Sequence, residues 1–175
     1  MNLRVGIAGA GSMGRNHARV YGLLDGVELE GVYDIDRSRA EDLAAEFGGR
    51  AVDSLEALSE FCDAVSVTVP TEGHFAVGSE LLRMGIHLLV EKPIASSEEE
   101  AETLVQLAAS TGRVLQVGHI ERFNPVLRQL EDRLNRPRFI EAHRLSPFPN
   151  RSLDIGVIFQ RSINQIFNFS NSFNS

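Results

Sequence analysis

The chain has 175 residues, of which 43% are hydrophobic, and a formal net charge of -7 at pH 7. This length and apolar content suffice for one packed domain with part of a second. The negative charge disfavours nucleic acid and membranes as partners, because both would repel the protein surface. No run approaches the about 18 apolar residues of a membrane span, and no leader precedes the first apolar run. The single cysteine, Cys62, is expected to be a small buried hydrophobe, which fits a cytoplasmic protein.

The apolar run LRVGIA leads directly into the glycine-rich segment GAGSMG, which begins at Gly9. This is the GxGxxG pattern of loops that bind the pyrophosphate of a dinucleotide. Gly9 allows a tight turn, Gly11 lets the backbone approach the phosphates, and Gly14 allows the next helix to pack closely on the strand. The first turn of that helix, with Ser12 and Met13, then directs its N–H groups toward the anion.

A second apolar strand, residues 27–33, is followed by Asp34, twenty residues after Gly14. An acidic side chain at this spacing binds the adenosine ribose diol of NAD, and its charge repels the 2′-phosphate of NADP. Arg37 and Arg39 follow closely and offer cations to such a phosphate. The sequence therefore favours NAD and leaves NADP open. The alternative for the whole pattern is a glycine-rich turn with a solvated aspartate.

Short apolar runs then alternate with helical patterns. Strands are expected within residues 3–8, 27–33, 50–52, 63–70, 86–93 and 114–119, and one helix is expected from about Glu72 to Met84. Cap and stop signals mark three more helices: Asp36 with Gly48, Asp53 or Ser54 with Phe61, and the capping box of Ser97 and Glu100 with Gly112.

Parallel strands with helical crossovers form an α/β doubly wound sheet of the Rossmann type. Such a sheet binds its ligand outside the carboxyl ends of its strands. The segments that end at Gly9, Asp34, Pro70, Lys92 and His119 are therefore expected to point to one edge. The sequence predicts a single site there.

Four short strings occur in order at the predicted strand ends: GAGSMG, VPTEGHF at 69–75, EKPIA at 91–95 and VGHIERFNP at 117–125. Together they resemble the Gfo/Idh/MocA oxidoreductases, over residues 1–159. The resemblance implies hydride transfer between a sugar-like alcohol and NAD(P). It also implies a dinucleotide-binding Rossmann domain at 1–122, the start of a substrate and oligomerisation α/β domain at 123–159, and a divergent tail at 160–175.

The resemblance assigns Lys92 the role of the lysine beside the reacting hydroxyl. An ammonium group there stabilises developing charge and exchanges a proton. The alternative is a solvated lysine at a strand end. Glu91 and Pro93 complete this motif, with Glu91 among the cofactor-binding residues. Thr71 and His74 match a segment on the nicotinamide side, although helix capping or a surface position is a close alternative for His74.

His119, Arg122 and Asn124 follow the last predicted strand. The resemblance places His119 against the cofactor and the other two near the substrate; the alternative is a polar loop that caps the next helix. His17 and His87 are expected to be packing or surface residues. The spacing of His, Cys and carboxylates predicts no metal site.

Residues 138–159 resemble the first strand of the family's substrate domain and the loop after it. The string SPFPNRSLDIGV is similar to the subgroup that acts on nucleotide-linked amino sugars, such as UDP-N-acetylglucosamine 3-dehydrogenases. This similarity implies a small-molecule sugar or nucleotide-sugar substrate. Arg144 and Arg151 are candidate cations for its diphosphate, or else solvated loop residues.

After Phe159 the family carries an aspartate and, four residues later, a histidine. Gln160 and Asn164 occupy these positions here, and neither amide exchanges a proton near neutral pH. The Asn-, Ser- and Phe-rich tail predicts a truncated or frame-altered protein. The exposed edge of an incomplete sheet predicts a homo-oligomer. We expect a dehydrogenase by family that retains cofactor binding, or alternatively a non-catalytic dinucleotide-binding, regulatory or interaction module.

Overall fold

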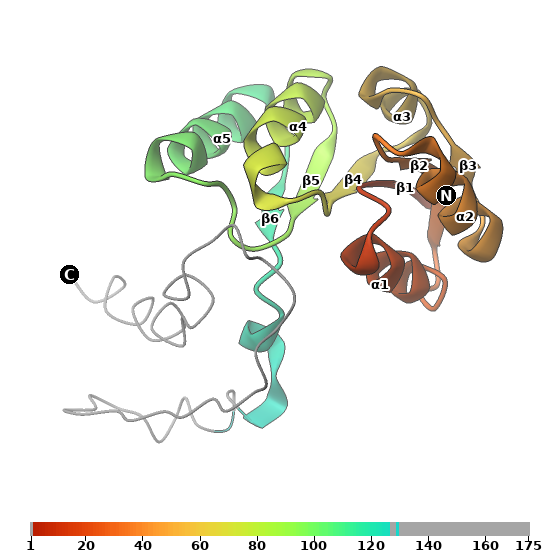
Figure 1. Cartoon of the computed structure of the whole chain (residues 1–175). Helices are drawn as coiled ribbons and strands as arrows, with labels where there is room; N and C mark the ends of the chain where they lie inside the picture. The colour runs from red at the N-terminus through yellow and green to blue at the C-terminus, as the bar shows by residue number, and fades with distance from the viewer. Residues whose placement is uncertain (1, 127–128, 130–175) are drawn as a thin grey trace. The chain divides into compact units, whose positions relative to one another are not determined.

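The computed structural model describes residues 2–126 and 129. The chain divides into two compact units, Met1–Gly118 and His119–Ser175. The second unit includes the short 3-10 helix η1 (Ile120–Phe123). The first unit alternates strands and helices (Figure 1): β1 (Leu3–Ala8), α1 (Ser12–Tyr21), β2 (Val27–Tyr33), α2 (Arg37–Phe47), β3 (Arg50–Ala51), α3 (Leu55–Phe61), β4 (Ala64–Val67), α4 (Thr71–Arg83), β5 (His87–Val90), α5 (Glu98–Thr111) and β6 (Leu115–Val117).

Within the described residues, six strands form one parallel sheet in the order β3-β2-β1-β4-β5-β6. The strand order reverses between β1 and β4, which is where doubly wound sheets bind their ligands. These two strands are in register from Val5 opposite Ala64 to Ala8 opposite Val67. The predicted fold class is confirmed, and β1 and β4 end side by side.

Three strands end two or three residues before the ends of the ranges in which the sequence predicts them. β4, β5 and β6 stop at Val67, Val90 and Val117. Proline has no N–H group to donate to a neighbouring strand, so Pro70 and Pro93 cannot continue the ladder. The segments beyond the strand ends, including Glu91 and Lys92, therefore lie in loops at the carboxyl edge of the sheet.

Helices cover both faces of the sheet. On one face, α1 and α2 bury Ile7 and Val32 of the strands against Ala18 and Leu43. On the other face lie α3, α4 and α5, which Figure 1 shows together on the side of the strands opposite α1. Burial of both faces explains why the strands are continuously apolar. The larger core on this second face includes Leu58, Leu81, Leu82, Leu88 and Leu104.

α3 packs closely on β1 and β2 because each strand carries a glycine beneath it. A Cβ atom at Gly6 would lie 2.7 Å from Sγ of Cys62, and one at Gly31 would lie 2.6 Å from Cδ1 of Leu58. Cys62 is buried, and burial raises the pKa of its thiol to about 12. The thiol is therefore protonated at neutral pH, and its predicted role as a small buried hydrophobe is confirmed.

Side chains cap three helices as the sequence predicts. Asp36 accepts a hydrogen bond from the N–H of Ser38 at the start of α2, at 3.2 Å. Ser97 accepts one from the N–H of Glu100 at the start of α5, also at 3.2 Å. Of the two candidates before α3, the cap is Ser54. These contacts satisfy N–H groups that have no partner inside the helix.

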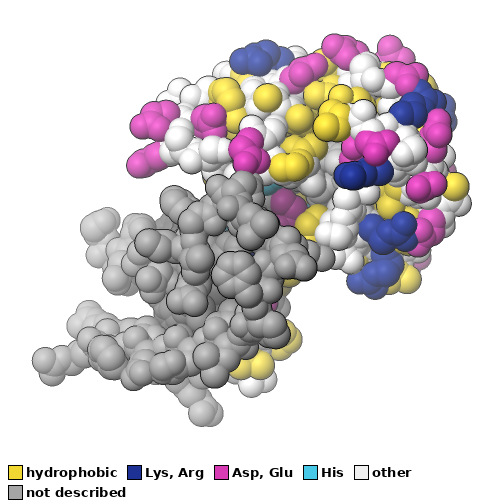
Figure 2. Space-filling model, in the orientation of Figure 1, with side chains coloured by type: hydrophobic (Ala, Val, Ile, Leu, Met, Phe, Trp, Pro, Cys, Tyr) yellow, Lys and Arg dark blue, Asp and Glu magenta, His cyan; other side chains and the backbone are white. Residues whose placement is uncertain are grey.

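Acidic and basic side chains are intermixed over the face of the described residues in Figure 2. Some of them form ion pairs between elements, such as Arg4 with Asp63 at 2.6 Å. No helix within residues 2–126 and 129 combines the length and the apolar character that crossing a membrane requires.

Candidate functional site

The GAGSMG loop joins β1 to α1 and packs against the end of β4. Gly9 has a φ of +105°, and a Cβ atom there would lie 2.6 Å from the backbone nitrogen of Val69. A Cβ atom at Gly14 would overlap the carbonyl oxygen of Gly9. Glycine is therefore required at both positions. Thr68, which the sequence did not single out, anchors the loop because its Oγ1 donates to the carbonyl oxygen of Gly9 at 2.7 Å.

Gly11 faces open space at the start of α1. A Cβ atom at this position would meet no neighbouring part of the described chain within 4 Å, so this glycine preserves open space beside the loop. Gly11 is the N-cap residue of α1, and no side chain caps the helix. The first turn, which begins at Ser12, therefore presents the positive end of the helix dipole to an anion. This start of α1 fits a pyrophosphate group.

Asp34 lies directly after β2 and contacts the glycine loop. Its Oδ2 accepts a hydrogen bond from the backbone N–H of Ala10 at 2.7 Å, and its Oδ1 accepts one from the N–H of Asp36 at 2.9 Å. Each carboxylate oxygen can accept a second hydrogen bond, so both remain available to a ribose diol. The structure thus brings together the two motifs from which the sequence predicts a dinucleotide site.

Ion pairs engage the two arginines that follow Asp34. Arg37 pairs with Glu41 at 2.9 Å and also with Asp53. Arg39 pairs with Asp36 at 3.3 Å. All these side chains are well exposed, so the pairs are weak and exchange readily with solvent. Both arginines thus have carboxylate partners, in exposed pairs that another anion can displace.

Lys92 lies at the carboxyl end of β5, next to the end of β4. Its side chain is exposed, whereas the preceding Glu91 is 9% exposed. Burial raises the pKa of Glu91, but the hydrogen bond from His17 and the charges of His17 and Lys92 outweigh this effect. The pKa of Glu91 therefore lies below its ordinary value, and its carboxylate is ionised at neutral pH.

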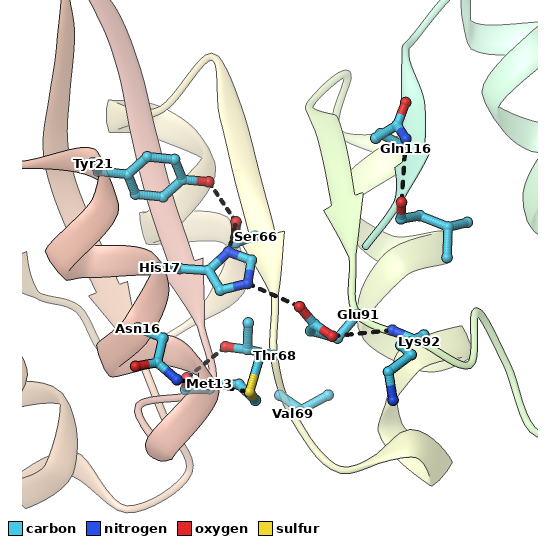
Figure 3. A network of polar contacts seen from close by, with 12 residues as sticks. Met13, Asn16, His17, Tyr21, Ser66, Thr68, Val69, Glu91, Lys92 and Gln116 are labelled. Atoms are coloured by element: carbon cyan, nitrogen blue, oxygen red, sulfur yellow. Dashed lines mark hydrogen bonds and ion pairs between the residues drawn. The ribbon is translucent and has the colours of Figure 1, made fainter. Parts of the chain in front are cut away.

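Glu91 belongs to a network of polar side chains that Figure 3 shows. His17 Nε2 lies 3.0 Å from Oε1 of Glu91, and His17 Nδ1 lies 2.9 Å from Oγ of Ser66. Ser66 also contacts the hydroxyl of Tyr21. The prediction that His17 is a simple packing or surface residue is incomplete, because this histidine joins α1 to the loop that carries Lys92. The sequence contains one signal for this role: His17 lies three residues after Gly14 and four before Tyr21, a spacing that places all three on the same face of α1.

Thr71 and His74 lie in the first turn of α4, and both are buried. The ring of His74 lies 2.8 Å from the carbonyl oxygen of Pro93 through Nδ1 and 3.0 Å from that of Val69 through Nε2. His74 therefore joins the loop after β4 to the loop after β5. A surface position for this histidine is wrong, because the ring is 2% exposed. Contact with the cofactor remains a prediction for both residues.

Three predicted residues belong to the second unit. The N–H of Arg122 donates to the carbonyl oxygen of His119 at 3.0 Å within η1. Asn124 donates to Glu121 at 3.0 Å and accepts from the N–H of Val126 at 3.0 Å. Contacts of His119, Arg122 and Asn124 with cofactor or substrate remain predictions. Outside the described residues lie Arg144, Arg151, Gln160 and Asn164.

The fold and the site define a dinucleotide-binding protein of the Rossmann class, with a lysine at the carboxyl edge of its sheet. The oxidoreductase family with an NAD-binding Rossmann fold, GFO_IDH_MocA, matches residues 3–119. The chain belongs to this Gfo/Idh/MocA family. The resemblance that the four motifs indicated is confirmed.

The chain is similar to several known members. It is 41% identical over 167 residues to the UDP-N-acetylglucosamine 3-dehydrogenase of Acidithiobacillus ferrooxidans. The aligned region covers 95% of this chain and 53% of that protein. The solved structure of that enzyme matches with a TM-score of 0.83 and 42% identity, over 91% of this chain and 52% of its own. The chain thus spans about half the length of this relative.

Two further structures contain a cofactor. GenD2 from gentamicin A biosynthesis, in complex with NAD, matches with a TM-score of 0.72 and 30% identity, over 75% of this chain and 38% of its own. KijD10, a 3-ketoreductase from Actinomadura kijaniata in complex with NADP, matches with a TM-score of 0.73 and 28% identity, over 77% and 42%. Members of similar fold thus bind either nicotinamide cofactor.

Proposed function

We propose that this chain binds NAD and forms the cofactor half of an oxidoreductase that acts on a sugar or nucleotide-sugar hydroxyl. The observation that carries the proposal is the hydrogen bond between Asp34 and Ala10, which brings the ribose-binding acid to the glycine loop. Gly11 leaves room for the pyrophosphate beside that bond. The identity to a UDP-N-acetylglucosamine 3-dehydrogenase supports the substrate class.

The residues of this chain would bind and orient the cofactor, while NAD supplies the hydride acceptor. Asp34 holds the adenosine ribose, and the start of α1 holds the diphosphate. Residues after β4 and β5, among them Lys92, would bind the nicotinamide half. The Lys92 ammonium group would stabilise negative charge on the reacting oxygen and exchange a proton with it.

NAD is the proposed cofactor in preference to NADP. The charge of Asp34 would lie beside the 2′-phosphate of NADP and repel it. Arg37 and Arg39 have carboxylate partners in Glu41, Asp53 and Asp36, so a 2′-phosphate would have to displace an ion pair to recruit either arginine. The charge of Asp34 is the main effect that disfavours NADP, because exposed ion pairs of this kind are weak.

The second candidate function is a module that binds the dinucleotide without turnover. The amides of Gln160 and Asn164 occupy the positions at which the family resemblance expects a proton-transferring aspartate and histidine. Neither amide accepts a proton near neutral pH. We propose that the chain by itself retains cofactor binding and lacks turnover.

Isothermal titration calorimetry with NAD tests the binding site, with Gly11→Ala as the variant. The backbone at Gly11 is extended and nothing crowds a Cβ atom there, so alanine is compatible with the fold but intrudes on the phosphate. We expect NAD affinity to fall at least about tenfold, which corresponds to about 1.4 kcal/mol.

Gly22→Ala is the matched control, because Gly22 lies at the other end of α1 and a Cβ atom there makes only ordinary contacts at 3.7 Å. This variant is expected to bind NAD as the unaltered chain does. Absence of NAD binding by the unaltered chain at millimolar cofactor, or equal affinity of Gly11→Ala, would contradict the proposed site.

A further inference from the structure

Four side chains from three parts of the first unit form one continuous polar chain (Figure 3). It runs from Tyr21 on α1 to Ser66 on β4, back to His17 on α1, and on to Glu91 after β5. Ser66 is fully buried, and the side chains of His17 and Glu91 are 13% and 12% exposed. Glu91 also accepts a hydrogen bond from the backbone N–H of Lys92 through Oε2, at 3.3 Å.

The donors and acceptors of this chain determine where its protons lie. An ionised carboxylate only accepts hydrogen bonds, so Nε2 of His17 carries the proton shared with Glu91. In the neutral ring, Nδ1 then accepts from the hydroxyl of Ser66. The oxygen of Ser66 accepts in turn from Tyr21. Each group thus has a matching partner, and the chain specifies one tautomer of His17.

The residue after β6 leaves room for the carboxylate of Glu91. A Cβ atom at Gly118 would lie 3.0 Å from Oε1 of Glu91, so the glycine makes space for the carboxylate. Glu91 is therefore held by α1 through His17 and by its own main chain through the N–H of Lys92, and Gly118 leaves room for its carboxylate. A buried carboxylate with these partners has one defined orientation.

The helix that contributes His17 is the helix whose start fits the diphosphate. The residue after Glu91 is the lysine proposed to face the substrate. In the proposed function Asp34 would hold the adenosine half at the end of β2, and residues after β4 and β5, on the other side of β1, would bind the nicotinamide half. The contact between His17 and Glu91 therefore links the phosphate-binding helix to the segment beside the nicotinamide.

We propose that His17 and Glu91 are a positioning pair that holds Lys92 in place relative to the diphosphate-binding start of α1. The pair acts through the main chain of Lys92, because Glu91 accepts the N–H of that residue. Loss of the pair leaves the adenosine half of the site intact and displaces the segment of Glu91 and Lys92, which would lie beside the nicotinamide. This inference rests on the proposed binding of NAD.

The test compares NADH with ADP as ligands for His17→Phe and His17→Gln. Phenylalanine fills the space of the ring but donates no hydrogen bond, whereas glutamine places an amide N–H at a similar reach to Nε2. We expect His17→Phe to bind ADP with unchanged affinity and NADH about tenfold more weakly, which is about 1.4 kcal/mol. His17→Gln is expected to recover most of the NADH affinity.

His87→Phe is the matched control. His87 begins β5 at the amino edge of the sheet, where its Nδ1 accepts from the N–H of Val114. Its loss is expected to leave the ratio of NADH to ADP affinity unchanged. Equal weakening of both ligands in His17→Phe would show general damage to α1 and overturn the proposal, as would unchanged NADH affinity or failure of His17→Gln to recover it.

Nitrogen-15 NMR of the ring of His17 tests the pair without any ligand. We expect the neutral ring to carry its proton on Nε2 in the unaltered chain, and this tautomer preference to weaken in Glu91→Leu. A proton on Nδ1 in the unaltered chain would overturn the pair. If the unaltered chain binds neither ADP nor NADH, the proposed cofactor function fails, and the NMR result still decides whether His17 and Glu91 are paired.

Discussion

Asp34 at the end of β2 accepts a hydrogen bond from the backbone N–H of Ala10 in the glycine loop, at an Oδ2 to N distance of 2.7 Å. The two residues belong to different βα connections, and this one contact places a carboxylate beside the diphosphate-binding turn. The same carboxylate therefore shapes the loop, and in the proposed function it also selects NAD over NADP.

Removal of the Asp34 charge is expected to relax discrimination against NADP. Asp34→Asn retains an oxygen that can accept from Ala10 but loses the charge that repels a 2′-phosphate. We expect the ratio of NADP to NAD dissociation constants to fall about tenfold, which is about 1.4 kcal/mol. Calorimetric titration with each cofactor measures this ratio.

The control for this charge change is Asp42→Asn, an exposed position on α2. It alters the net charge equally but lies outside the βα connection that holds Asp34. Its ratio of NADP to NAD dissociation constants should match that of the unaltered chain. If Asp34→Asn leaves the ratio unchanged as well, Asp34 does not face the ribose.

The chain by itself is expected to produce no NADH from UDP-N-acetylglucosamine and NAD. The reason is that Gln160 and Asn164 cannot transfer a proton as the aspartate and histidine expected at these positions would. Nicotinamide fluorescence over a long incubation measures the product. Turnover that Lys92→Ala abolishes would contradict this prediction and show that another group accepts the proton.

Glu91 is expected to make folding stability depend on acid pH. Its pKa in the folded chain is lowered by the hydrogen bond and charge of His17 and by the charge of Lys92, despite the opposing effect of burial. A lowered folded pKa contributes stability above the unfolded pKa, and this stability is lost as the pH falls through the folded pKa.

Glu91→Gln removes this titration. Urea unfolding at a series of pH values should show the largest stability difference between Glu91→Gln and the unaltered chain near neutral pH. The difference should shrink once the pH falls below the ordinary range of a glutamate side chain. A difference that stays constant throughout the acid range would mean that Glu91 has the same pKa in the folded and unfolded states.

Leu58→Ala is expected to destabilise the first unit by about 2–5 kcal/mol. Leu58 is fully buried and fills the space above Gly31 and near Gly6, where α3 packs on the sheet. Denaturant unfolding followed by circular dichroism measures the loss. Val105→Ala on α5, where the side chain is 55% exposed, should change stability by less than about 0.5 kcal/mol. Equal effects would contradict the packing of α3.

Much of the fold was predictable because its signals are local. The start of α5 follows from Ser97 and Glu100, and the residues that cap and stop a helix lie within a few positions of it. The ends of β4 and β5 are less predictable, since an extended pattern continues for two residues after Val67 and Val90, up to Pro70 and Pro93, although these residues are outside the strands. Hydrophobicity reports burial there and not pairing.

The site was predicted in part. The need for glycine at Gly9 and Gly14 is predictable, because it depends on backbone geometry within one turn, while the contact of Gly11 with a phosphate stays a prediction. His17 was not identified, since its partner Glu91 lies 74 residues away in the sequence. Thr68 was also missed, because its contact with Gly9 exists only when β1 and β4 lie side by side.

The order of strands and helices and the chemistry at each strand end follow from local signals, since periodicity, caps and turn glycines act between neighbouring residues. Which of these groups meet depends on the folded chain. The crossovers bring Asp34 to Ala10 and His17 to Glu91, and no local pattern records such contacts. Packing of the helices on the sheet fixes these distances.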